Sequence, residues 1–156
     1  MSIKNVVTDQ YRNIANAAGK AVEQFSMPPE GWVRTVRKAL CLSGEQLAKR
    51  VGVTRAQVFK TEKAEVSGNV TIKTLQSMAE AMNCRFVYAI VPLGTIEDLI
   101  VHQAKKKALK LVQKTNVHMA LESQSLTLEQ IDYEIDRLTQ QLIERMPSDF
   151  WTDKDK

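Results

Sequence analysis

The residues best suited to a chemical role follow Thr54, in a stretch where polar and basic side chains recur at helical spacing. Arg55, Ala56 and Gln57 come first, and Lys60 follows about one helical turn later. An arginine near the start of a helix can donate two hydrogen bonds to the edge of a guanine, and a lysine can pair with a phosphate. The chemistry expected here is therefore recognition of nucleic acid.

Two short helices joined by a tight turn would hold these side chains in place. Ser43 and Thr54 are favourable N-caps, and Gly52 suits the left-handed backbone conformation that ends a helix. The apolar positions expected to face inward are Leu47, Ala48, Val51, Val53 and Val58. This layout predicts a helix-turn-helix whose second helix enters the DNA major groove, and an ordinary helical hairpin is the alternative.

Different positions of this motif are expected to make different contacts with DNA. The candidates for reading bases are Arg55, Ala56 and Lys60. The candidates for binding phosphate are Thr54, Gln57, Lys49 and Lys63. Phosphate contacts set position and affinity, whereas contacts with base edges set the preferred sequence. Phe59 has two interpretations, contact with a thymine methyl or packing against the turn.

Helices on either side of the motif are expected to complete one small core. The positions expected to be buried by a helix over 32–40 are Trp32, Val36 and Leu40. Those expected to be buried by a helix over 71–82 are Ile72, Leu75, Met78 and Met82. Apolar residues that recur every three or four positions are typical of helices that pack on one face.

Residues 32–82 resemble the Xre/lambda-repressor-type helix-turn-helix family. In that family an arginine in the first helix often pairs with a glutamate after the recognition helix, and Arg37 and Glu62 occupy those positions. The resemblance therefore implies a structural role for both. The sequence departs from the family at Gly44, where a glutamine that touches a phosphate is usual, and at Ala64, where a glycine is common.

The charges are unevenly distributed along this chain of 156 residues and net charge +4. Residues 34–63 hold eight basic and two acidic side chains, whereas residues 122–156 hold nine acidic and four basic ones. This asymmetry favours DNA at one surface and another partner elsewhere, although two solvated faces would give the same pattern. No signal peptide or membrane-spanning stretch is recognisable, and two unpaired cysteines indicate a reducing, cytoplasmic location.

The segments before and after the motif offer ways to form a homodimer. A helical arm over 3–25 carries a heptad-like stripe, which would either pack on its own domain or cross to a second subunit. Residues 85–92 are rich in aromatic and branched side chains and predict a strand, with an extended linker as the alternative. The strand positions expected to pair across a twofold axis are Arg85, Val87, Ala89 and Val91.

The C-terminal part is expected to form a helical hairpin. One helix follows the N-cap Thr95 and carries lysines opposite its apolar face; a second follows Thr127 and stops before Pro147. Phe150 and Trp151 would either dock on the body of the protein or anchor a partner.

The segments VYAIVP, IEDLIVHQAKKKA, VHMALESQ and the late FW pair resemble the mobile mystery protein A family, which joins an Xre-type domain to a helical extension. Members of that family are typically encoded beside a protein with a Fic domain. The resemblance implies a regulator, and an antitoxin that binds and neutralises the Fic-type partner is the alternative function.

An enzymatic role is not expected, because the two histidines show no metal-ligand spacing with the cysteines and no phosphate-binding glycine loop occurs. No catalytic residue, metal or cofactor is assigned, and no membrane partner. The expected fold is all-α, a lambda-repressor-like helix-turn-helix domain with an N-terminal helical arm, one short β-strand and a C-terminal helical hairpin. The predicted segments are 1–27 for the arm, 28–83 for the DNA-binding domain, 84–92 for the strand and 93–156 for the extension. The expected function is a sequence-specific, dimeric repressor that binds a palindromic operator on double-stranded DNA.

Overall fold

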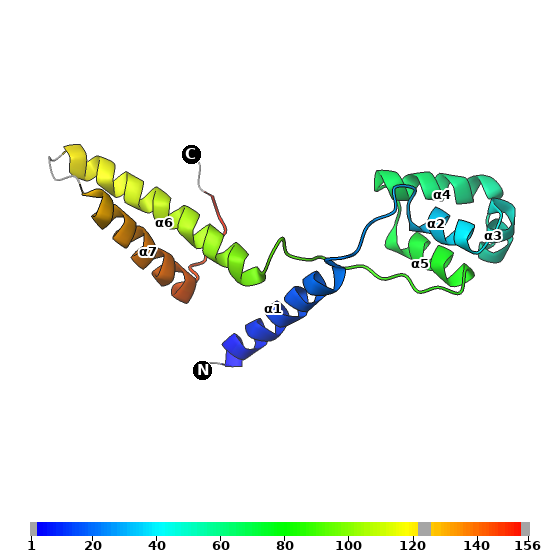
Figure 1. Ribbon diagram of the computed structural model, residues 1–156, viewed down its shortest axis with the longest axis horizontal. Coiled ribbons are helices and arrows are strands. Elements are labelled where there is room, and N and C mark those ends of the chain that lie inside the picture. The colour runs from blue at the N-terminus through cyan, green and yellow to red at the C-terminus, as the bar shows by residue number, and fades with distance from the viewer. Residues whose placement is uncertain (1–2, 122–125, 154–156) are drawn as a thin grey trace. The chain divides into compact units, whose positions relative to one another are not determined.

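The computed structural model describes residues 3–121 and 126–153, and all regular structure in these ranges is helical (Figure 1). The helices are α1 Ile3–Val22, α2 Trp32–Ala39, α3 Gly44–Val51, α4 Arg55–Ser67, α5 Ile72–Ala81, α6 Ile96–Leu121 and α7 Leu128–Arg145. The helical character expected from the sequence is therefore confirmed. The last part of the VHMALESQ segment, residues 122–124, lies outside the described residues.

The chain divides into two compact units. The central unit, residues 23–89, contains α2 to α5. The terminal unit combines residues 1–22 with residues 90–156 and contains α1, α6 and α7. No helix in the described ranges is long and apolar enough to cross a membrane.

The strand predicted over 84–92 is wrong, because these residues form no regular structure. A strand needs neighbouring backbone to satisfy its donors and acceptors, and the described ranges contain no strand that pairs with this segment. The side chains of Val87 and Ile90 are 65% and 94% exposed. The twofold pairing predicted for Arg85, Val87, Ala89 and Val91 loses its basis with the strand.

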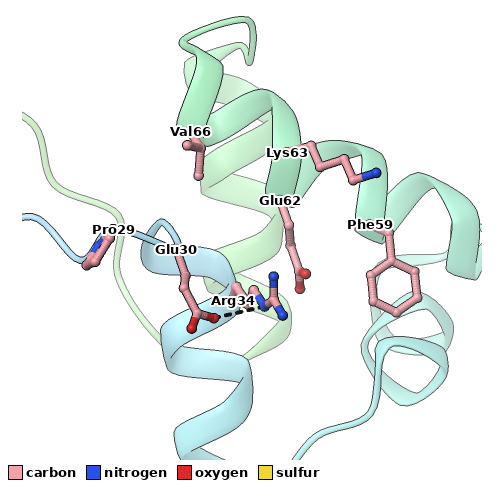
Figure 2. Close-up of a pocket in the computed structure, with 7 residues that line it drawn as sticks. All are labelled: Pro29, Glu30, Arg34, Phe59, Glu62, Lys63 and Val66. Carbon is pink, nitrogen blue, oxygen red and sulfur yellow. Dashed lines mark ion pairs between the residues drawn. The ribbon is translucent and has the colours of Figure 1, made fainter.

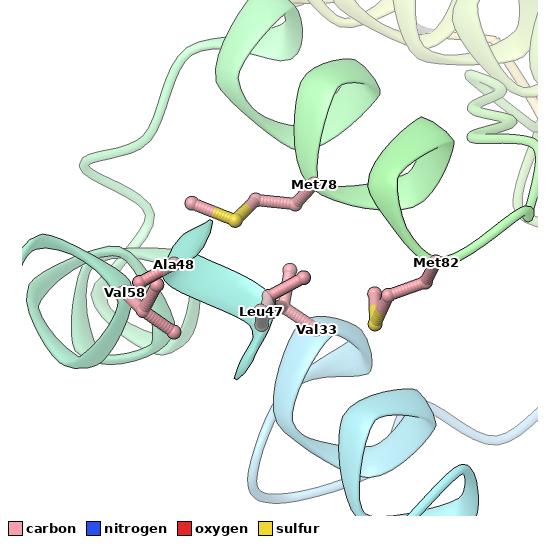
Figure 3. Close-up of a cluster of buried hydrophobic side chains, with 6 residues drawn as sticks. All are labelled: Val33, Leu47, Ala48, Val58, Met78 and Met82. Carbon is pink, nitrogen blue, oxygen red and sulfur yellow. The ribbon is translucent and has the colours of Figure 1, made fainter. Parts of the chain in front are cut away.

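A single apolar cluster holds the four helices of the central unit together (Figure 3). Its buried members are Val33, Leu47, Ala48, Val58, Met78 and Met82. Most of these positions match the pattern predicted for α3, α4 and α5. Removing such a well-buried apolar side chain typically costs about 2–5 kcal/mol, so this cluster is the main support of the unit.

Helix α2 is turned relative to the prediction. Val33 and Arg37 are the buried residues; Val36 is half-buried and packs against the core cluster as expected, whereas Leu40 is 48% exposed. Trp32 is only half-buried; its ring stacks on that of Phe25 with centroids 5.2 Å apart. The rotation follows from Arg37, whose guanidinium must face inward to reach a buried carboxylate on α4, so that Val33, one turn earlier, faces inward too.

The terminal unit has its own core. Ile100 and Ala104 of α6 pack with Phe150 from the segment after α7, and Phe150 is 2% exposed. The carbonyl of Phe150 also accepts a hydrogen bond of 2.9 Å from the Gln103 side chain. The expected docking of this late aromatic residue is thus observed, although Trp151 stays 60% exposed.

Helix α1 joins this unit through Asn16. The Asn16 Oδ1 accepts from the backbone N–H of Ile96 at 2.9 Å, and its Nδ2 donates to the Glu97 carboxylate at 2.8 Å. This contact satisfies a free N–H group at the start of α6. The predicted stripe of α1 is largely uncovered within the unit, with Tyr11 and Ile14 69% and 67% exposed.

Candidate nucleic-acid interface

Helix α4 has one buried and one exposed side. Val58 and Glu62, one turn apart, are 0% and 5% exposed and fix the helix to the central unit. Ala56, Lys60 and Lys63 follow the spacing of a single helix face and all are exposed. This exposed face is polar, basic and uncommitted to the core, as a helix that enters a DNA groove requires.

The start of α4 is fixed by a capping box. The Thr54 Oγ1 accepts from the backbone N–H of Gln57, and the Gln57 Oε1 accepts from the backbone N–H of Thr54, each at 3.2 Å. The acceptor oxygens of both side chains are thus engaged in the cap. What remains for a phosphate is the Gln57 amide NH₂ group and the Thr54 hydroxyl proton, which are donors, as a phosphate oxygen needs.

A tight turn fixes the start of α4 relative to α3. Helix α3 begins at a second capping box, formed by Ser43 and Gln46, and ends at Gly52. The Gly52 backbone has φ 83°, in the left-handed region that strongly favours glycine. Because both helix starts and this turn are fixed by local contacts, the position of the first turn of α4 is well defined.

Lys49 lies on α3 and is 78% exposed at its side chain. Its Nζ lies 3.3 Å from the Glu45 carboxylate one turn earlier, so part of its charge is already balanced. Exposed pairs of this kind contribute little to stability and exchange readily for a phosphate. Arg50, its neighbour, donates instead to the carbonyl of Ala81 at 3.3 Å.

A buried ion pair joins α2 to α4. The Arg37 Nε lies 2.6 Å from the Glu62 Oε1, and the Arg37 Nη2 lies 3.2 Å from the Glu62 Oε2. The remaining Nη1 donates to the carbonyl of Leu42 at 3.0 Å. Such bidentate geometry satisfies both buried charges. The pair positions α4 but faces away from its exposed side.

Phe59 is 37% exposed and lies over the start of α3. Its ring centroid is 5.3 Å from the Arg55 Cζ and 5.8 Å from the Arg37 Cζ. A Cβ atom at Gly44 would approach the Phe59 Cζ to 2.9 Å. The structure therefore brings together a base-reading candidate, a structural arginine and an aromatic ring, which spacing alone did not reveal.

Sequence reasoning also missed Glu65, which caps α2 from another helix. Its carboxylate accepts from the backbone N–H groups of Trp32 and Val33, at 2.7 and 3.0 Å. The N-cap of α2 is Gly31, which has no side chain to do this. A negative group at a helix N-terminus is favourable, so Glu65 adds a second link between α2 and α4.

A groove of about 350 Å³ lies between the N-terminal part of α2 and α4 (Figure 2). Its lining residues are Pro29, Glu30, Arg34, Phe59, Glu62, Lys63 and Val66. Glu30 binds Arg34 at 2.9 Å and Lys38 at 2.8 Å. The hydrogen bond and charge of Lys38, followed by the charge of Arg34, lower the pKa of Glu30.

The cations of α4 are available to a ligand. Within the described ranges Arg55, Lys60 and Lys63 form no ion pair with a carboxylate. An exposed basic helix face whose cations are not held in ion pairs attracts phosphate.

Comparison with known families gives a match over residues 33–88, to the helix-turn-helix family. No curated protein and no solved structure matches the chain. The match covers α2 to α5, the helices that place Arg55, Ala56 and Lys60 on an exposed face. Residues 33–88 therefore form a helix-turn-helix domain of the Xre/lambda-repressor type, which supports a DNA-binding regulator.

Proposed function

We propose that the protein is a sequence-specific transcriptional repressor that occupies an operator through α4. The observation that carries this proposal is that one side of α4 packs on the core while the other side is exposed. Val58 and Glu62 hold the helix from its buried side, while Arg55, Ala56 and Lys60 are exposed and make no contact needed by the core. These three positions would read base edges from the major groove, and no enzymatic step is involved.

The phosphate contacts in this proposal come from the edges of the same motif. Lys49 and Lys63 supply positive charge, and Thr54 and Gln57 supply the donors left over from their capping box. These contacts would fix the register of α4 on the duplex without selecting a sequence.

We also propose that the repressor binds as a homodimer to a palindromic site. Helix-turn-helix proteins commonly place two recognition helices about 34 Å apart, one turn of DNA, because a single helix reads only a few base pairs. The dimer contact is not a strand at residues 84–92, since that segment has no regular structure. The uncovered stripe of α1, with Tyr11 and Ile14, is an alternative surface for it.

Selection of bound duplexes from a random DNA pool at near-physiological salt tests both proposals. An enriched palindrome with half-sites one turn apart supports a dimeric, sequence-specific repressor. An enriched single half-site keeps specific binding but rejects the dimer. If no sequence is enriched, base reading by α4 is rejected.

A second candidate function is binding of a partner protein, with a Fic-type protein as the candidate suggested by the family resemblance. The observation that favours it is a helical unit outside the helix-turn-helix match with large exposed apolar side chains. Val117, Leu128 and Tyr133 are 62%, 81% and 68% exposed on α6 and α7. Exposed apolar side chains of this size are common in protein interfaces.

Co-purification of the full chain with the product of the adjacent gene tests the second candidate. The double variant Leu128→Asp, Tyr133→Ala should then lose the partner while it keeps DNA binding. Failure of the unmodified chain to retain that product would reject this function and leave the repressor proposal untouched.

A further inference from the structure

Phe59 is an aromatic residue that does not belong to the core of the central unit. It projects from α4 (Figure 2), is 37% exposed, and lies outside the buried apolar cluster of the central unit. An aromatic side chain loses a substantial hydrophobic contribution when it is left partly in water, so its contacts decide what it does.

The contact nearest the DNA-facing side is with Arg55. Arg55 and Phe59 are four residues apart on α4 and therefore lie on one face, one turn from each other. The Arg55 Cζ lies 5.3 Å from the ring centroid, within the range of a cation–π contact. Arg55 has no carboxylate partner in the described ranges, so the Phe59 ring, and not an ion pair, restrains its guanidinium.

The ring itself is held in place from two other directions. The absence of a side chain at Gly44 makes room for it, since a Cβ there would come within 2.9 Å of the Phe59 Cζ. Arg37 lies 5.8 Å from the ring centroid, and this arginine is locked by Glu62 and by the Leu42 carbonyl. The position of the ring is thus determined by α2 and α3, not by α4 alone.

We propose that Phe59 is a positioning residue for DNA sequence recognition, which orients the Arg55 guanidinium toward a base edge. The lack of a side chain at Gly44 leaves the room that the Phe59 ring needs for this role. This inference rests on the proposed function. An arginine that is already oriented loses less side-chain freedom when it binds, so its base contact becomes more selective.

The test compares Phe59→Leu with Arg55→Ala in the full chain, by the sequence preference of each variant on the selected operator and on its single-base-pair variants. Phe59→Leu keeps an apolar side chain but removes the π face. Arg55→Ala should remove the preference for the operator over variants changed at one particular base pair. Phe59→Leu should weaken the preference at that same base pair about two- to fivefold, as expected for an exposed cation–π contact. In the Arg55→Ala background, Phe59→Leu should change nothing further.

Two more variants separate positioning from folding. Gly44→Ala leaves the residues Phe59 and Arg55 in place, but its added methyl group should displace the Phe59 ring. It should therefore reproduce the loss of sequence preference at the same base pair. Val66→Ala is the matched control, because Val66 is an apolar residue of the same helix, 60% exposed, and has no aromatic ring to offer Arg55 or Arg37. Thermal unfolding of each variant shows whether the central unit remains folded.

The outcomes are distinguishable. If a folded Phe59→Leu variant keeps the full preference for the operator over its single-base-pair variants, the positioning role is overturned and the repressor proposal stays intact. Loss at a different base pair from that of Arg55 overturns it in favour of direct contact between the ring and DNA. An equal loss for all sequences indicates only a structural role and also overturns it. If the unmodified chain selects no sequence, the proposed function fails first and this inference falls with it.

Discussion

The two units use lysine in different ways. On α6 of the terminal unit, Lys106 lies 2.6 Å from Asp153 and Lys107 lies 3.2 Å from Asp149, both in the segment after α7. On α4 of the central unit, Lys60 and Lys63 form no ion pair in the described ranges. A lysine-rich helix is therefore not by itself a phosphate-binding face. The availability of the charge depends on which acidic side chains the fold brings to it.

One ion pair in each unit shows what burial changes. The central unit buries the pair of Arg37 and Glu62, with side chains 10% and 5% exposed, whereas the side chains of Arg12 and Asp9 on α1, 3.5 Å apart, are 29% and 57% exposed. Buried charges depend on each other because neither can be hydrated when the other is lost. Exposed pairs contribute much less. The four predictions below test this contrast, in order of decreasing expected effect.

Arg37→Ala should destabilise the central unit by about 3–5 kcal/mol, because it leaves the Glu62 carboxylate buried without a partner. Denaturant unfolding followed by far-UV circular dichroism measures the change. Arg12→Ala in the terminal unit is the control and should cost less than about 1 kcal/mol. Similar losses for the two variants would show that burial does not distinguish the pairs.

Arg55→Ala should weaken binding to the selected operator by about 1–3 kcal/mol, the usual contribution of one bidentate base contact. Binding to a scrambled duplex should change much less. Fluorescence anisotropy titrations on the two duplexes give the ratio. An unchanged ratio would remove Arg55 from the base-reading residues.

Lys63→Ala should lower affinity for operator and scrambled DNA alike, and reduce the slope of log affinity against log salt by about one unit. Lys106→Ala should leave that slope unchanged, because its ammonium is paired with Asp153. Titrations over a series of salt concentrations measure both slopes. A loss of slope in Lys106→Ala would mean that the acidic segment gives way to DNA.

Glu30→Gln should produce the smallest effect, a change in the pH dependence of stability. The folded-state pKa of Glu30 is lowered, chiefly by Lys38, so its contribution is present above the unfolded pKa and is lost as pH falls through the folded one. The variant should be slightly less stable than the unmodified protein at pH 7. This difference should shrink as pH falls and vanish at an acidic pH below the folded-state pKa of Glu30. Urea unfolding at both pH values tests this, and a difference that persists in acid would exclude the charge as its cause.

The sequence predicts the helix-turn-helix well because its signals are local. Ser43 and Thr54 act on backbone groups two or three residues away, and Gly52 needs only its own backbone conformation. The same reasoning places Leu47 and Val58 inside, since helical spacing alone defines the face.

The misses all involve contacts between residues far apart in the chain. The rotation of α2 depends on Glu62, the cap of α2 on Glu65, and the neutralisation of Lys106 on Asp153. The strand prediction at 84–92 failed for a related reason, since a β-prone segment becomes a strand only when it finds a partner. Gly44 carried a signal in its departure from the family pattern, but its meaning required the position of Phe59.

The separation of a buried and an exposed side on α4 affects how the DNA specificity of this protein can evolve. Ala56 and Lys60 are exposed, and the helix is held by Val58, Glu62 and Glu65. Substitutions at the exposed positions therefore fall where stability effects are usually within about 0.5 kcal/mol. A new operator preference can arise by exchange of these side chains while the fold is inherited unchanged. The same property makes positions 56 and 60 suitable for a library of altered DNA specificities.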